Sequence, residues 1–101
     1  MGVGDPDQLH PESGARLLFE LTESGDEDAR YRITALLPGT ERHEGEGQVV
    51  LGTEQVEVEG LRSAPDWVRT LAQRFLRQIA AGQRKRSQPR WPRRVLRWRE
   101  K

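Results

Sequence analysis

One amphipathic segment, residues 63–81, constrains the fold more than any other part of the chain. Its apolar residues come in adjacent pairs at helical spacing: Trp67/Val68, Leu71/Ala72, Phe75/Leu76 and Ile79/Ala80. This i, i+3, i+4, i+7 pattern predicts a helix with one broad apolar stripe and a polar opposite side. A stripe of such large side chains needs an apolar surface to cover it, and the rest of the domain has to supply that surface.

Both ends of this helix carry sequence signals. Ser63 and Asp66 have the spacing of a capping box, and Pro65 suits the first helical turn, where no backbone N–H is needed. Gly82 is expected to end the helix in the left-handed conformation that glycine adopts easily. We therefore predict one helix over residues 63–81.

The front half of the chain supplies the partner surface. Alternation of apolar and polar residues predicts four strands, over residues 15–22, 29–37, 48–51 and 55–59. The acidic residues 23–28 fit a hairpin tip, Gly52-Thr53 fits a two-residue type II′ turn, and the glycine-rich residues 38–47 are expected to form a loop. The side chains expected to face the helix are Phe19, Leu21, Tyr31, Ile33, Val56 and Val58.

These elements predict an α+β fold, a four-stranded antiparallel β-meander packed on one C-terminal amphipathic helix (β-β-β-β-α). Hydrophobic residues make up 34% of the chain and charged residues 33%, so one sheet face and one helix would exhaust the core. We expect a flexible lead-in over residues 1–14, the domain over residues 15–82 and a basic tail over residues 83–101. The second sheet face would be mixed, either solvent-exposed or a weak dimer surface, and carries Leu18, Arg30, Arg32, Thr34, Leu36, Glu57 and Glu59.

The conformation of the tail stays open at this stage. Read as a short helix opened by Pro92, it places Trp91, Val95 and Trp98 on one face. Read as an edge strand, it places Leu96 and Trp98 on one face and Val95, Arg97 and Arg99 on the other. Periodicity cannot separate these two alternatives in so short a segment.

Charge is distributed very unevenly along the chain. Residues 1–60 carry four Arg and fourteen Asp or Glu, a net charge of −10. Residues 61–101 carry thirteen Arg or Lys and two acids, a net charge of +11. Such asymmetry indicates a role in binding nucleic acid, binding a membrane or self-association.

Two functions fit this tail. The first is a small binding module that contacts nucleic acid, because arginines neutralise phosphates and tryptophans stack on unpaired bases. The alternative is a structural or adaptor protein that associates with itself or a protein partner through the tail and the acidic sheet, since Trp and Arg are frequent interface anchors. A membrane surface is disfavoured because the apolar face is small. A further alternative is that the tryptophans complete the core of the chain's own sheet and the arginines are solvated. The candidate contacts are Arg84, Lys85, Arg86, Arg90, Trp91, Arg93, Arg94, Arg97, Trp98 and Arg99.

Other classes of function have little support in the sequence. The chain has no Cys, which rules out disulfides and thiolate metal sites, and no apolar run of about 18 residues or more that would span a membrane. The N-terminal residues lack the features of a signal peptide, so we expect a cytoplasmic protein. His10 and His43 stand alone in predicted loops, without a nucleophile and base pair or converging ligands. We therefore expect no enzyme activity, metal, cofactor or small-molecule substrate.

Overall fold

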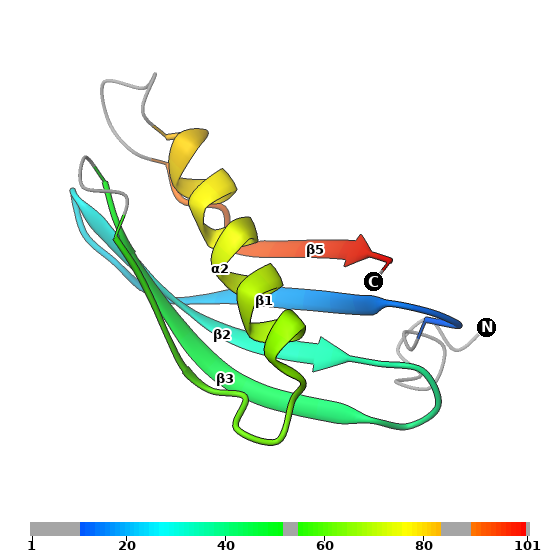
Figure 1. The fold of residues 1–101 in the computed structure, drawn as a ribbon. Coiled ribbons are helices and arrows are strands. Elements are labelled where there is room, and N and C mark those ends of the chain that lie inside the picture. The colour runs from blue at the N-terminus through cyan, green and yellow to red at the C-terminus, as the bar shows by residue number, and fades with distance from the viewer. Residues whose placement is uncertain (1–10, 52–54, 84–89, 101) are drawn as a thin grey trace.

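One helix lies across one face of a single sheet (Figure 1). The computed structural model describes residues 11–51, 55–83 and 90–100. Its elements are β1 (Ala15–Ser24), β2 (Asp28–Leu36), β3 (Arg42–Val50), β4 (Val56–Gly60), α2 (Asp66–Ala81) and β5 (Arg94–Arg99). The strands are ordered β4-β3-β2-β1-β5, and every neighbouring pair is antiparallel. The predicted α+β class and antiparallel sheet are confirmed.

The sheet has five strands where we predicted four, because the tail contributes β5. Of the two conformations left open for this segment, the edge strand is the one observed. β5 pairs with β1 from Ala15↔Arg99 to Glu20↔Arg94. β1 and β5 are therefore neighbours, and β1 is paired with a strand on each of its two edges. A hairpin pattern identifies partners that are adjacent in sequence, so it could not reveal this pairing.

The predicted loop over residues 38–47 is wrong for its second part, because β3 already begins at Arg42. Glycines in a polar segment are typical of turns, but Gly47 is buried inside the strand. A Cβ atom on Gly47 would lie only 2.5 Å from Cδ1 of Leu76 in α2. Glycine at this position lets the helix approach the sheet closely, which is a packing role and not a turn.

A sharp reversal carries the chain from β4 onto the helix side of the sheet. Gly60 and Leu61 both have positive φ angles, 78° and 53°, in the left-handed region. For Leu61 this conformation is unusual, and burial of its side chain together with a 3.1 Å bond from its N–H to the Glu44 carbonyl holds it there. Arg69 of α2 places Nη2 3.5 Å from the carbonyl oxygens of both residues.

The helix ends differ from the predicted ones. α2 begins at Asp66 after Pro65 and has no side-chain cap hydrogen bond, so the predicted capping box from Ser63 is wrong. Gly82 is right-handed, with φ −66° and ψ −19°, and its N–H donates to the Gln78 carbonyl at 3.2 Å. A right-handed last residue continues the helical turn, which is why no left-handed cap is needed. The predicted Gly52-Thr53 turn lies outside the described residues.

The core forms between α2 and the sheet face that the sequence predicted. Phe19 is fully buried and makes edge-to-face contacts with Tyr31 and Phe75, with ring centroids 6.4 Å and 6.2 Å apart. Trp91 and Val95 join this core from the β5 side. The predicted helix stripe is confirmed, and its buried members are Val68, Leu71, Ala72, Phe75, Leu76, Ile79 and Ala80.

We call the sheet surface opposite α2 the open face. Directly paired residues of antiparallel strands share a face, so the registers give its rows. One row runs Leu96, Leu18, Thr34, Glu44, and the next runs Arg94, Glu20, Arg32, Glu46, Glu59. Thr34 and Leu36 are buried although they point away from the helix, because β2 is the central strand and its neighbours flank them.

Candidate nucleic-acid interface

The tail is anchored to the sheet by buried contacts before β5 begins. Trp91 is only 7% exposed and belongs to the core. The Tyr31 hydroxyl donates to the Pro92 carbonyl at 2.7 Å, and the Leu21 N–H donates to the Arg93 carbonyl at 2.8 Å. The side-chain oxygen of Gln83, which is also buried, accepts from the Arg90 N–H at 2.6 Å. These contacts fix the backbone that carries the arginines.

Tyr31→Phe is expected to lower the free energy of unfolding by about 1 kcal/mol, because the Pro92 carbonyl loses its donor. Burial raises the pKa of Tyr31 from 10.0 to about 12, so the folded chain holds the phenol proton more tightly than the unfolded chain. The stability linked to this proton is complete below pH 10 and is lost as the pH rises from 10 to 12.

Urea denaturation of both proteins, below pH 10 and again between pH 10 and 12, measures this linkage. Tyr31→Phe should lose less stability over this interval than the unchanged chain. Tyr31 is the single tyrosine, so its absorbance change on ionisation follows the pKa directly. Equal losses in the two proteins, or a tyrosine that ionises at its ordinary pKa, would contradict the prediction.

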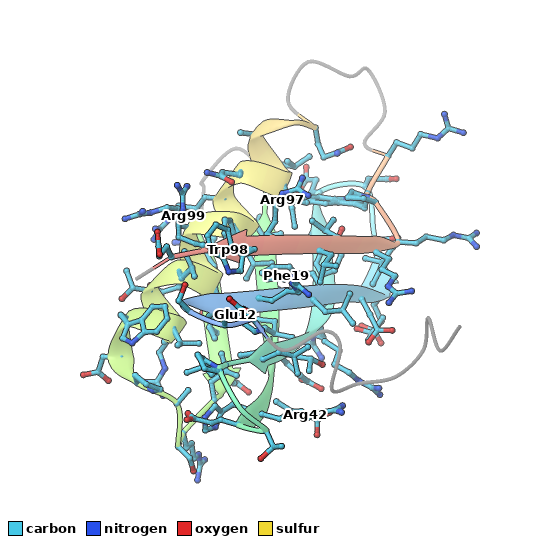
Figure 2. All side chains as sticks on the ribbon, turned by 90° about the vertical axis from the view of Figure 1, so that its right-hand side faces the viewer. Glu12, Phe19, Arg42, Arg97, Trp98 and Arg99 are labelled. Carbon is cyan, nitrogen blue, oxygen red and sulfur yellow. The ribbon has the colours of Figure 1, made fainter. Side chains whose placement is uncertain are left out.

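Trp98 is the tryptophan of the tail that solvent reaches. It is 50% exposed, and Leu96 on the same strand is 42% exposed; these are the exposed large hydrophobic side chains among the described residues. The Trp98 Nε1–H donates to the Ser13 carbonyl at 3.0 Å, which holds the ring in one orientation. Figure 2 shows Arg97, Trp98 and Arg99 along the outermost strand.

The arginines of β5 divide between two faces of the sheet. Arg94 pairs with Glu20 and lies on the open face with Leu96 and Trp98. Arg97 and Arg99 pair with buried residues of β1 and therefore lie on the helix side, as the strand interpretation predicted. Every arginine from position 90 to position 99 is exposed. The predicted contacts Arg84, Lys85 and Arg86 lie outside the described residues.

Two further arginines, which sequence reasoning did not include in the site, adjoin this surface. Arg16 of β1 is the register partner of Trp98, and Arg32 of β2 is separated from Arg94 by Glu20 in one row. We define the basic platform as Arg16, Arg32, Arg94, Leu96 and Trp98. The alternation in β2 had placed Arg32 on this face, but only the β1–β5 pairing brings it near the tail.

A groove between α2 and β5 adds basic residues on the other side of the strand. It is lined by Trp67, Thr70, Leu71, Arg74, Arg99 and Glu100. Arg74 and Arg99 are both exposed, and Trp67 is partly exposed. The guanidinium groups near this groove extend the positive surface around the edge of the sheet.

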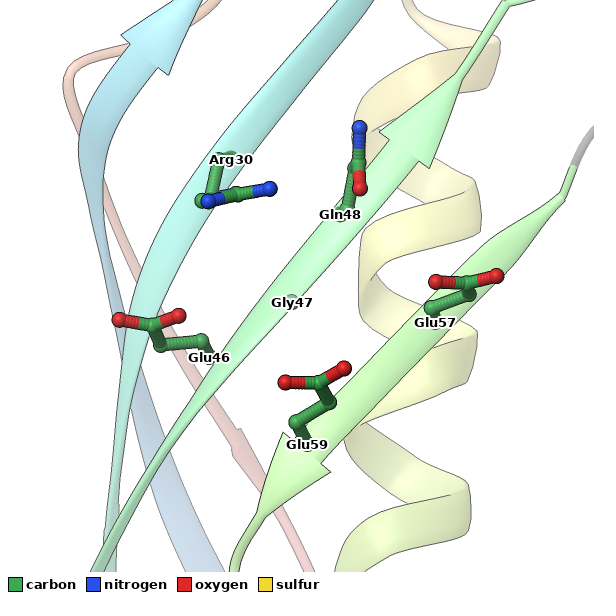
Figure 3. Close-up of a pocket in the computed structure, with 6 residues that line it drawn as sticks. All are labelled: Arg30, Glu46, Gly47, Gln48, Glu57 and Glu59. Carbon is green, nitrogen blue, oxygen red and sulfur yellow. The ribbon is translucent and has the colours of Figure 1, made fainter.

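The far half of the open face has the opposite charge. We define the acidic corner as Glu44, Glu46, Glu57 and Glu59, which lie on β3 and β4. Figure 3 shows a shallow hollow in it, lined by Arg30, Glu46, Gly47, Gln48, Glu57 and Glu59. The sequence predicted an acidic sheet. The sheet as a whole is not acidic, because β1 and β2 contribute arginines to the same face.

Neither a metal site nor a membrane helix is visible in the described parts of the chain. Within residues 11–51, 55–83 and 90–100, no group of three or more His, Cys, Asp or Glu side chains is placed to hold a metal ion. His43 instead lies with Nε2 2.7 Å from the Glu41 carboxylate, a local pair next to the start of β3. No helix among the same residues has the length and apolar character needed to cross a bilayer.

The architecture of the candidate interface thus combines an anchored edge strand, a half-exposed tryptophan and arginines drawn from three strands. Comparison of the chain with protein-family models, with curated proteins and with solved structures found no match.

Proposed function

We propose that this protein is a small non-enzymatic binding module whose basic platform contacts single-stranded nucleic acid. The observation that carries the proposal is Trp98, a half-exposed ring on the open face whose cross-strand partner is Arg16. Tryptophan faces stack on unpaired bases and tolerate any base sequence. A base in a duplex is already stacked, and a shallow sheet face does not enter a groove, so single strands are favoured.

The arginines supply the second half of the interaction. Arg94 lies next to Leu96 on the open face of β5, and Arg16 is the cross-strand partner of Trp98. Arg32 lies in the row of Arg94, on the far side of Glu20. Guanidinium groups bind phosphate oxygens in a bidentate manner and release counterions from the strand. Three such contacts on a single strand predict a slope of about −2 for the logarithm of affinity against the logarithm of salt concentration.

Trp98→Ala should weaken binding of a fluorescent single-stranded oligonucleotide about tenfold, because one base loses its stacking partner. Trp98→Phe keeps an aromatic face and should retain most of the affinity. Arg94→Gln should also weaken binding and make the salt slope shallower. Arg77→Gln, an exposed arginine on α2 outside the platform, is the matched control and should change little.

Fluorescence anisotropy across a salt series measures these effects, with thermal melting of each variant as the check on folding. Wild-type affinity that does not change with salt concentration would contradict the proposal. Equal affinity of Trp98→Ala and the unchanged protein for the oligonucleotide would contradict it as well. Stronger binding to a duplex than to a single strand would overturn the role given to stacking.

A further inference from the structure

The strand β5 has a free edge. It is an outer strand of the sheet (Figure 1), and among the described strands it pairs only with β1. The Leu21 N–H donates to the Arg93 carbonyl, which fixes the phase of the hydrogen bonds along this pair. Bonding groups alternate between the two sides of an antiparallel strand. The backbone N–H and C=O groups of Arg94, Leu96 and Trp98 therefore point away from β1, toward the free edge.

One arginine covers part of this edge in the unbound chain. Nη1 of Arg97 donates at 3.0 Å to the Leu96 carbonyl, which is one of the groups directed outward. A charged side chain on an edge strand opposes uncontrolled extension of the sheet. The contact is exposed, so an incoming acidic strand can replace it. A backbone N–H of that strand then donates to the carbonyl, and a carboxylate accepts from the guanidinium.

The groove between α2 and β5 borders the same strand on its helix side. Trp67 and Arg74 of α2 and Arg99 of β5 contribute to its lining. Glu100 also lines it, and the Glu100 carboxylate accepts from the Ser13 hydroxyl at 3.3 Å. The groove therefore offers an aromatic ring and two guanidinium groups against one carboxylate, which favours an anionic ligand.

We propose that an extended acidic segment of a partner protein adds to the free edge of β5 as a further antiparallel strand. Its backbone pairs with Arg94, Leu96 and Trp98, and its side chains alternate between the two faces of the sheet. Acidic side chains lie on the helix side, where Arg97 and Arg99 meet them at the mouth of the groove. The intervening side chains are apolar, because they lie beside Leu96 and Trp98 on the open face.

The charges of β5 favour an acidic partner over a second copy of this chain. The strand contains three arginines and no acid. Pairing of β5 with β5 of a second copy would bring arginines from both sides into one ladder, and like charges across paired strands are destabilising. An acidic strand makes the same arginines attractive. The inference goes beyond the proposed function, since it uses the backbone edge and the helix side of β5.

The test uses a fluorescein-labelled peptide of six residues, the length of β5, in which Glu and Val alternate. Directly paired residues share a face, so the Val residues pair with Arg94, Leu96 and Trp98, and their N–H groups point to β5. Methylation of the Val nitrogens removes these donors and should weaken binding to the full chain about tenfold or more. Methylation of the Glu nitrogens is the matched control, because it leaves these donors and all charges unchanged, and it should retain the affinity.

Substitutions in the protein test the helix side of the edge. Arg99→Gln and Arg74→Gln should each weaken binding of the unmethylated peptide about threefold at low salt, because each removes one positive charge from the groove. Arg42→Gln makes the same charge change on β3, which β1 and β2 separate from β5, and should bind the peptide like the wild type. Fluorescence anisotropy measures the affinities, and thermal melting checks the folding of each variant.

Equal binding of the two methylated peptides would show charge attraction without strand pairing and would overturn the inference. An unmethylated peptide that does not bind at low salt would overturn it as well. A dimer of the protein that excludes the peptide, detected by sedimentation velocity, would place a second copy on the edge instead. A chain that binds single-stranded oligonucleotide and no peptide refutes only this inference, and a chain that binds the peptide and no oligonucleotide refutes only the proposed function.

Discussion

A chain that ends at Gly82 is expected to lose its cooperative fold. This truncation removes Trp91 and Val95 from the core, together with the carbonyl group of Pro92 that accepts from Tyr31. Loss of a buried tryptophan alone costs about 3–5 kcal/mol. A domain of this size has a total stability of about 5–15 kcal/mol, so the combined loss is comparable to the whole.

The truncation also exposes β1 as a new sheet edge. Its six register pairs with β5 disappear, from Ala15↔Arg99 to Glu20↔Arg94. An apolar strand with free backbone groups is a site for aggregation. A binding assay on this truncated chain would therefore report loss of the fold, whereas a single substitution in β5 keeps the strand in place.

Circular dichroism and urea denaturation measure the effect of this truncation. The matched control ends at Arg99, which removes two residues and keeps β5 complete. We expect the control to unfold at nearly the midpoint of the full chain, and the shorter chain to show a broad transition or none. A cooperative transition at an unchanged midpoint in the chain ending at Gly82 would show that β5 is dispensable.

Gly47→Ala is expected to destabilise the protein by about 1–3 kcal/mol, the usual cost of forcing a methyl group into a packed core. The added Cβ would lie 2.5 Å from Leu76 Cδ1 and 3.0 Å from Ile33 Cδ1, so α2 or the side chains beneath it have to move. Backbone strain is not the cause, because Gly47 has no positive φ angle. The effect is one of space.

A double-mutant cycle tests this explanation. Leu76→Ala alone should cost about 2–5 kcal/mol, because a fully buried side chain leaves a cavity. In the double variant the methyl group on residue 47 occupies part of that cavity. The double variant should therefore lose less stability than the sum of the losses in the two single variants. Urea denaturation gives the three free energies. Additive costs would mean that the two positions do not compete for the same space.

Local patterns predicted the elements whose signals lie within one segment. The stripe of α2, the first hairpin and the inward side chains of β1 and β2 follow from periods of 3.6 and 2 alone. β3 was predicted too short because Gly45 and Gly47 look like turn residues in a sequence. Their true role depends on what approaches them, namely the Glu59 carbonyl and Leu76, and no local window contains those partners.

The candidate site was predictable in part for the same reason. The composition of the tail pointed to Arg94 and Trp98, and the strand alternative placed Trp98 on the face opposite Arg97 and Arg99, as observed. The burial of Trp91 and the proximity of Arg16 to Trp98 both follow from the pairing of β5 with β1. That pairing joins the two ends of the chain, so it is invisible to any rule based on short spacing.

The position of β5 has a consequence for synthesis of the protein on the ribosome. β1 is made before its partner β5, so Phe19 and the rest of the core cannot be sealed until β5 has been synthesised. Contacts between distant segments slow folding, and incomplete chains expose apolar strands. The nascent chain should therefore stay sensitive to proteases until β5 has left the exit tunnel and paired with β1.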